Sequence, residues 1–139
     1  MKTEPVFLDT NILLYAASNA AADKNKKKIA TEIIQQQPFR ISAQVVQEFI
    51  ANVLRKPKLG LGETHIDALL ELSAAQETVA TDVALIQGAT NRRRRFKISH
   101  WDACILEAAS RMGCTCVYTE DLNHGQIYGD VRVLNPFIK

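Results

Sequence analysis

Apolar residues occur along the chain in short continuous runs, separated by longer stretches in which apolar and polar positions alternate with helical spacing. The short runs are rich in Val, Ile, Leu, Phe and Tyr, a composition that predicts buried strands. These predicted strands cover residues 5–8, 39–41, 116–118 and 131–134, with a weaker candidate at 78–80.

The longer stretches place apolar residues three and four positions apart, which predicts amphipathic helices. They cover residues 10–15, 23–37, 42–56, 66–70, 82–95 and 99–112. Thr10, Ser42 and Ser99 stand where helix N-caps are expected. The spacing also puts Leu54, Ile86 and Trp101 on the buried stripes of the helices at 42–56, 82–95 and 99–112.

Strands that alternate with helices imply right-handed crossovers and a mainly parallel central sheet with helices on both faces. We therefore predict an α/β fold of three layers. The 139 residues contain no internal repeat and no long linker, so we expect one domain over residues 1–139.

The composition is ordinary for a soluble globular protein, with 47% hydrophobic and 23% charged residues. No apolar run approaches the roughly 20 residues of a membrane span, and the first residues lack the features of a secretory signal. We expect a cytoplasmic protein with no membrane partner. The three cysteines lack zinc-finger spacing and are expected to be reduced thiols, with a zinc site or a redox pair as the alternative.

The net charge of +2 says little, but the cations are clustered. One run contains Lys24, Lys26, Lys27 and Lys28, and a second contains Arg92, Arg93, Arg94 and Arg95, followed by Lys97. Such runs attract phosphate backbones, and we expect the arginine run to bind RNA. The alternative is a solvated helix face whose arginines interact with the helix dipole.

Acidic residues fall at positions that the predicted sheet would bring together. Asp9 and Asp121 each follow a predicted strand, and Glu48 lies on the helix that begins after the second strand. The carboxyl ends of parallel strands meet at one edge of a sheet, where ligand sites form. Asp102 borders the buried face of its helix, where an unpaired carboxylate costs free energy.

Each acid also has an ordinary structural explanation. Asp9 and Asp121 are typical of helix caps or turns, Glu48 is far enough from its apolar stripe to be solvated, and Ser99-x-x-Asp102 resembles a capping box. The case for a site therefore depends on their joint placement. Clustered carboxylates repel one another, and Mg²⁺ or Mn²⁺, which prefer oxygen ligands, would remove that penalty.

Four segments of the chain resemble the PIN-domain family. Residues 6–13 combine a hydrophobic strand with Asp, a small hydroxyl residue and Asn, and residues 117–121 form a strand that ends in Thr-x-Asp. Residues 41–49 and 99–106 resemble the segments that contain the family's second and third acids. The order and spacing match over nearly the whole chain, and the layout resembles VapC-type toxins. One departure is that Asp121 is followed by Leu122 and Asn123 instead of a second acid.

The resemblance implies a PIN-like fold and a metal-dependent endoribonuclease that hydrolyses RNA to 5′-phosphate and 3′-hydroxyl ends, as the toxin of a type II toxin–antitoxin pair. The catalytic and metal-binding acids would be Asp9, Glu48, Asp102 and Asp121. The supporting polar groups would be Thr10, Asn11, Ser42 and Thr119. Expected partners are an RNA substrate, a cognate antitoxin and a second copy of the chain. The alternative is a nucleic-acid-binding PIN module without hydrolysis.

Overall fold

A computed structural model of the chain describes residues 4–138. The strands are β1 (Val6–Leu8), β2 (Phe39–Arg40), β3 (Cys116–Tyr118), β4 (Ile127–Tyr128) and β5 (Val131–Leu134). The helices are α1 (Thr10–Ala17), α2 (Lys24–Gln36), α3 (Ala43–Arg55), α4 (Glu63–Ala74), α5 (Val83–Phe96) and α6 (His100–Arg111). Two short 3₁₀ turns, η1 (Ala21–Asp23) and η2 (Pro57–Leu59), complete the order.

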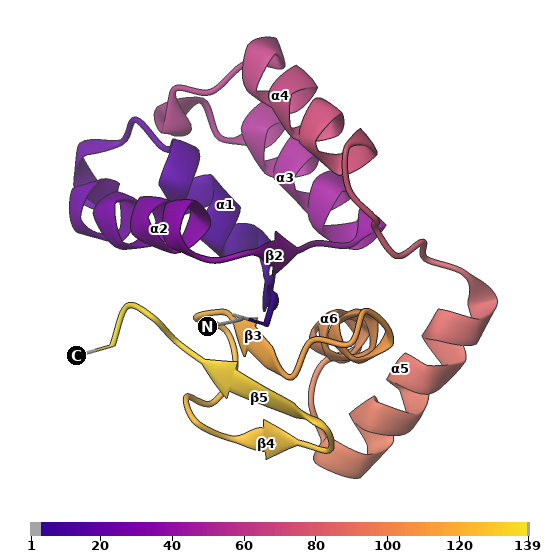
Figure 1. The fold of residues 1–139 in the computed structure, drawn as a ribbon. Coiled ribbons are helices and arrows are strands. Elements are labelled where there is room, and N and C mark those ends of the chain that lie inside the picture. The colour runs from indigo at the N-terminus through magenta and orange to yellow at the C-terminus, as the bar shows by residue number, and fades with distance from the viewer. Residues whose placement is uncertain (1–3, 139) are drawn as a thin grey trace.

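The strands form one sheet in the order β2-β1-β3-β5-β4, in which only β4 and β5 pair antiparallel. Figure 1 shows α1 and α2 on one side of this sheet and α5 and α6 on the other. The prediction of a mainly parallel α/β sheet flanked by helices is therefore confirmed. The strands are short runs of apolar residues because the sheet is covered on both faces.

The central strands and the inner faces of the helices share one hydrophobic core. Phe7 and Leu8 of β1, Val117 of β3 and Val133 of β5 are completely buried. Leu106 of α6 is equally inaccessible. This rigid packing places the carboxyl ends of β1 and β3 side by side, with Leu8 paired in register with Tyr118.

Several apolar residues predicted to be buried are exposed, among them Leu54 of α3 at 64%. Trp101 is 64% exposed and Ile86 is 38% exposed, whereas Leu85 and Ile105 are buried as predicted. Trp101 lies in the first turn of α6. The spacing of apolar residues predicts which face of a helix is buried. It does not predict how far along the helix the neighbouring elements cover that face, so residues beyond the covered part are exposed.

Three local predictions also need correction. Asp9, and not Thr10, is the N-cap of α1, since its side chain accepts a hydrogen bond from the Thr10 backbone N–H. The expected strand at 78–80 is reduced to a single bridge between Val79 and Ser42. Strand β4 was not predicted, because Ile127 and Tyr128 stand between Gln126 and Gly129 without a longer apolar run or alternation. It pairs with β5 through a tight turn in which Gly129 has a φ of 74°.

The three cysteines are free thiols, with Cys104 and Cys114 buried and Cys116 half-buried. Over residues 4–138, no helix is both long enough and apolar enough to cross a membrane.

Candidate active site

Asp9 lies at the point where β1 ends and α1 begins, and its carboxylate is held on both oxygens. Oδ1 accepts a hydrogen bond of 2.7 Å from the Thr10 backbone N–H, and Oδ2 accepts one of 2.7 Å from the Thr119 hydroxyl. The Asp9 backbone N–H donates to the Tyr118 carbonyl, which locks this turn to β3. The carboxylate is thus fixed in place before any ligand arrives.

Asp9 is only 5% exposed, and this burial has an electrostatic cost. Burial raises the pKa of Asp9 to about 7, the nearby charges of Asp121 and Glu48 add to the rise, and the hydrogen bonds from Thr119 and Thr10 oppose it. Without a cation, Asp9 therefore holds its proton over much of the range below neutrality.

Asp121 reaches the same place from the loop after β3. The Asp121 backbone N–H donates to the Thr119 hydroxyl oxygen at 3.1 Å, and Asn11 Nδ2 donates to Asp121 Oδ2 at 3.2 Å. Asn11 Nδ2 also lies 3.3 Å from Thr119 Oγ1. One threonine hydroxyl thus connects Asp9, Asn11 and Asp121, and these bonds set the relative positions of the two aspartates.

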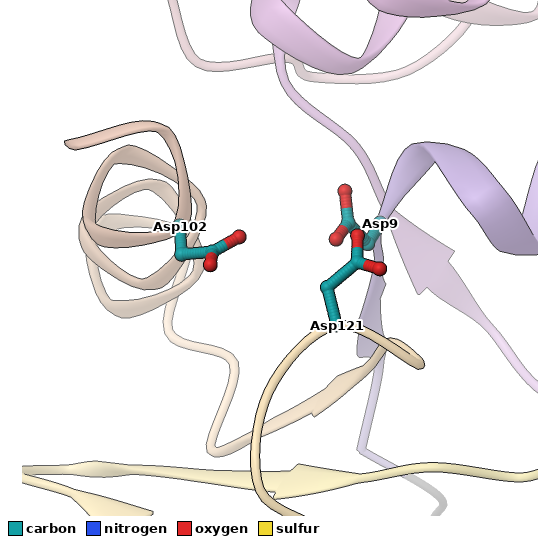
Figure 2. A group of neighbouring side chains, drawn as sticks. All are labelled: Asp9, Asp102 and Asp121. Carbon is teal, nitrogen blue, oxygen red and sulfur yellow. The ribbon is translucent and has the colours of Figure 1, made fainter. Parts of the chain in front are cut away.

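Asp102 comes from the first turn of α6. The Ser99 hydroxyl caps this helix by accepting a 3.1 Å hydrogen bond from the Asp102 backbone N–H. The capping interpretation of this segment is therefore correct for the backbone, and it leaves the Asp102 carboxylate directed towards Asp9 and Asp121 (Figure 2). Partial burial raises the pKa of Asp102, hydrogen bonding of its carboxylate by the Ser99 side chain lowers it, and the charge of Asp121 raises it.

The three aspartates form a compact group. One carboxylate oxygen from each of Asp9, Asp102 and Asp121 lies within 4.8 Å of the other two. Figure 2 shows them converging from α6, from the end of β1 and from the loop after β3. Three carboxylates at this separation repel one another unless a proton or a cation lies between them. The arrangement is therefore suited to a hard divalent cation.

Glu48 lies beside this group without belonging to it. Glu48 Oε1 accepts hydrogen bonds from the Thr10 hydroxyl at 3.0 Å and from Gln44 Nε2 at 3.4 Å. Together with Asp9 and Asp121 it lines a cavity of about 370 Å³. The solvated alternative for Glu48 is thus wrong, because α3 turns its side chain towards α1.

Residues 6–130 match the family model of the PIN domain. The chain belongs to the PIN-domain family. No relative with a curated description matches it by sequence.

Solved structures with this PIN fold include several toxin–antitoxin proteins. A toxin–antitoxin complex from Klebsiella pneumoniae matches with a TM-score of 0.66 at 15% identity, covering 95% of this chain and 98% of that chain. VapC20 from Mycobacterium tuberculosis, described as a sarcin-ricin-loop-cleaving toxin, matches with a TM-score of 0.64 at 17% identity, covering 84% and 91%. VapBC2 from Rickettsia felis, solved with a DNA fragment from its promoter, matches with a TM-score of 0.60 at 17% identity, covering 94% and 97%.

The four predicted supporting residues of this PIN domain have two kinds of role. Thr10, Asn11 and Thr119 donate side-chain hydrogen bonds to the acids or to one another. Ser42 instead caps α3 by accepting from the Val45 backbone N–H at 3.3 Å, so it positions the helix that contains Glu48 without touching a carboxylate. Gln44 was missed, although its position four residues before Glu48 on a helix could have indicated the contact.

Glu120, which directly precedes Asp121 in the loop after β3, has a structural role. Glu120 accepts hydrogen bonds from the Tyr15 hydroxyl at 2.5 Å and from Lys26 Nζ at 2.9 Å. Lys26 also lies over the Tyr15 ring, 4.7 Å from its centroid. These contacts attach the loop that contains Asp121 to α1 and α2.

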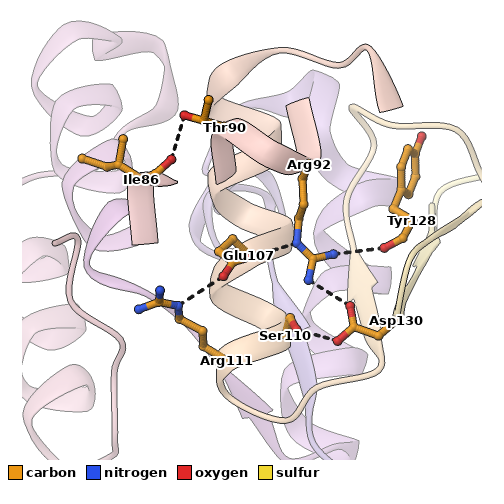
Figure 3. Close-up of polar contacts among 8 residues, drawn as sticks. All are labelled: Ile86, Thr90, Arg92, Glu107, Ser110, Arg111, Tyr128 and Asp130. Atoms are coloured by element: carbon orange, nitrogen blue, oxygen red, sulfur yellow. Dashed lines mark hydrogen bonds and ion pairs between the residues drawn. The ribbon is translucent and has the colours of Figure 1, made fainter. Parts of the chain in front are cut away.

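The arginines of the α5 run lie in different environments. Arg92 donates to Glu107 Oε1 at 2.8 Å, to Asp130 at 2.9 Å and to the Tyr128 carbonyl at 3.1 Å (Figure 3). Its side chain is 16% exposed, and its guanidinium connects α5, α6 and the β4–β5 turn. Arg94, Arg95 and Lys97 are exposed and Arg93 is half-buried.

Proposed function

We propose that this chain is a divalent-metal-dependent endoribonuclease and the toxin of a type II toxin–antitoxin pair. The observation on which the proposal rests is the convergence of Asp9, Asp102 and Asp121 to within 4.8 Å at the carboxyl edge of the sheet. Membership of the PIN-domain family supports a nuclease, and the toxin–antitoxin neighbours support the biological setting.

The residues present fit Mg²⁺ or Mn²⁺. Asp9, Asp102 and Asp121 would hold the ion through carboxylate oxygens, the ligands that both cations prefer. Asn11 Oδ1 is buried without a hydrogen-bond partner among residues 4–138, and it is available to accept from an ion-bound water. When bound, the ion supplies charge neutralisation at the phosphate and an acidified water.

The chain's own groups prepare this chemistry. The hydrogen bonds from Thr119 and the Thr10 backbone keep Asp9 in one orientation, so that loss of its proton leaves a ligand already in place. We assign to Glu48, whose Oε1 accepts hydrogen bonds from Thr10 and Gln44, the role of accepting a proton from an attacking water in the acidic cavity. No covalent intermediate with the protein is needed.

An RNA substrate and an antitoxin partner are parts of the same proposal. One neighbour of this fold is described as cleaving the sarcin-ricin loop, which supports RNA as the substrate. Arg93, Arg94, Arg95 and Lys97 offer positive charge for the backbone on α5 and at its end. The complexes among the neighbours support an antitoxin that binds this chain, and pairing with a second copy stays a prediction.

The test is cleavage of structured RNA by the purified protein in Mg²⁺, in Mn²⁺ and in EDTA. Asp9→Asn and Asp102→Asn are expected to abolish cleavage, whereas Asp67→Asn, at an exposed position on α4, is expected to leave it unchanged. Equal cleavage by the wild type and both site variants would refute the proposal, because it would identify a contaminating nuclease. RNA binding without cleavage in any metal would instead establish the non-catalytic binding module.

A further inference from the structure

A groove adjoins the acidic cavity and is separate from it. It lies between α3 and the start of α6, has a volume of about 550 Å³, and is lined by side chains that include Ala51, Thr81, Ile86 and Trp101. Glu48 lines both the groove and the acidic cavity. The groove and the acidic cavity therefore adjoin at Glu48.

The groove displays an aromatic ring that contributes little to the core. Trp101 is 64% exposed although it directly precedes Asp102. The His100 ring packs edge-on against the indole, with centroids 4.9 Å apart. Gln44 Nε2 lies 3.3 Å from the Trp101 carbonyl and 3.4 Å from Glu48 Oε1, so one amide ties the first turn of α6 to α3. The Trp101 indole is thus exposed to solvent on a helix turn whose backbone is held against α3.

We propose that this groove holds an unpaired nucleobase, stacked on the Trp101 indole, next to the scissile phosphate at the aspartates. The inference rests on the proposed ribonuclease function and adds the class of RNA that the site accepts.

The order of acidic, aromatic and basic side chains along the surface favours a strand of nucleotides as the ligand of the groove. Ile86 lines the groove and also an adjoining depression that is lined by Arg94. Acids suited to a metal-held phosphate, an exposed indole and an arginine thus follow one another along the surface. A single strand presents a phosphate, a base and the next phosphate in the same order, and proteins hold such strands with aromatic platforms beside cations.

This geometry restricts the substrate. A base inside a duplex is already stacked on its neighbours and cannot reach the indole, whereas loops and bulges supply unstacked bases. The exposed Gln47 amide and Thr81 hydroxyl line the groove and can hydrogen-bond to base edges. We therefore expect cleavage next to an unpaired nucleotide.

Fluorescence provides a direct measurement, because Trp101 is the only tryptophan of the chain. An Asp9→Asn protein, which cannot cleave, is titrated with an RNA hairpin that has an unpaired loop and, separately, with a blunt duplex of the same length. Binding of each RNA is followed by anisotropy. We expect the hairpin to quench the indole emission and the duplex to leave it unchanged. Equal quenching by both RNAs, or no quenching by the hairpin, would overturn the proposal.

Kinetics of the otherwise wild-type enzyme give a second test. Trp101→Ala is expected to raise KM for the hairpin about tenfold with little change in kcat, and Trp101→Phe is expected to recover most of the loss. Ile127→Ala is the matched control, since Ile127 is also 64% exposed but lies on β4. The melting temperature of Trp101→Ala should equal that of the wild type, because the side chain is mostly in solvent.

The outcomes separate this inference from the proposed function. Quenching of the Asp9→Asn protein by loop RNA, together with no cleavage by the wild type in Mg²⁺ or Mn²⁺, would support the stacking site and refute the nuclease. Cleavage with an unchanged KM in Trp101→Ala would support the nuclease and overturn the stacking site. If Trp101→Ala weakens binding of a partner protein and leaves KM for RNA unchanged, the groove is a protein-binding surface and the proposal is wrong.

Discussion

At the residue scale, the site combines a buried acid with hydrogen bonds that only partly offset its burial. Asp9 is fixed by Thr10 and Thr119, yet burial still raises its pKa to about 7. An environment that disfavours an isolated charge favours a divalent cation that neutralises it. The apo protein is therefore expected to lose stability where Asp9 ionises and to regain it when metal binds.

Asp9→Asn tests this cost. The folded-state pKa of Asp9, about 7, is above the ordinary value of 3.8, so the folded state binds the proton more tightly. Its contribution to stability is complete below about pH 4 and is lost as the pH rises towards 7. In EDTA, Asp9→Asn should therefore melt at a higher temperature than the wild type at pH 8, with a smaller difference at pH 5. Thermal melts of both proteins, with Asp67→Asn as the control, provide the measurement. A variant less stable than the wild type at pH 8 would contradict the prediction.

Thr119→Val tests the hydroxyl that joins the acids. Thr119 is completely buried, donates to Asp9 and accepts from the Asp121 backbone. Loss of this hydroxyl should weaken metal affinity and activity by about 10- to 100-fold, as is typical for groups that orient metal ligands. Thr119→Ser keeps the hydroxyl and should retain most of the activity. The Mg²⁺ concentration at half-maximal cleavage measures the effect, and identical values for the two variants would argue against this role.

At the element scale, the position of α6 controls both the acid cluster and the packing of α5. Its first turn presents Asp102 to the site, while its later residue Glu107 binds Arg92 of α5. The Glu107 carboxylate of α6 lies so close to Gly88 of α5 that a Cβ at this position would overlap one of its oxygens. The absence of a side chain at Gly88 thus leaves room for the ion pair in Figure 3.

The stability of an Arg92→Gln variant tests whether Arg92 has a structural role that the exposed arginines of α5 lack. The pair of Arg92 and Glu107 is mostly buried, and removal of the cation leaves Glu107 without its best partner. We expect a loss of about 2 kcal/mol in the free energy of unfolding. Arg94→Gln, at an exposed position on the same helix, should change stability by less than about 0.5 kcal/mol. Denaturant unfolding of both variants decides the point, and equal losses would show that Arg92 has no special role.

At the scale of the whole molecule, the cations of the chain lie on different elements. The arginines and Lys97 lie on α5 or at its end, beyond the tryptophan groove, whereas the lysine run lies on α2. If α5 holds the RNA backbone, the salt dependence of binding should depend on α5 and not on total charge.

A pair of triple variants with equal charge tests this distribution. Arg93→Gln, Arg94→Gln and Arg95→Gln combined should reduce the slope of log affinity against log salt by about 2, since each single-strand phosphate contact contributes about 0.7. Lys24→Gln, Lys27→Gln and Lys28→Gln combined remove the same charge from α2 and should leave the slope nearly unchanged. Anisotropy titrations with the hairpin RNA over a range of salt give both slopes. Equal slopes for the two triple variants would contradict the prediction, because RNA binding would then depend on the total positive charge and not on contacts made by α5.

Much of this protein could be predicted because its information is local. Short apolar runs and helical spacing predicted four of the five strands and all six helices, since both signals depend on neighbouring residues. Because the carboxyl ends of parallel strands meet at one edge of the sheet, the positions of Asp9 and Asp121 after their strands predicted that they lie together. Position along the chain also made Glu48 and Asp102 candidates, but a solvated side chain and a capping residue remained as alternatives, and the resemblance to the PIN-domain family favoured the site.

Contacts between distant segments were decided only by the tertiary structure. Spacing along a helix does not specify where its covering neighbours end, so Trp101 was expected in the core and is exposed at the groove. Nor does a run of four arginines reveal that Arg92 binds Glu107 and Asp130, which lie 15 and 38 residues away. The sequence by itself determined the elements and the edge where the acids meet, because propensity and periodicity act locally. The distances between the acids and the positions of the acidic cavity and the tryptophan groove arise only when the packed core fixes helices and loops against the sheet.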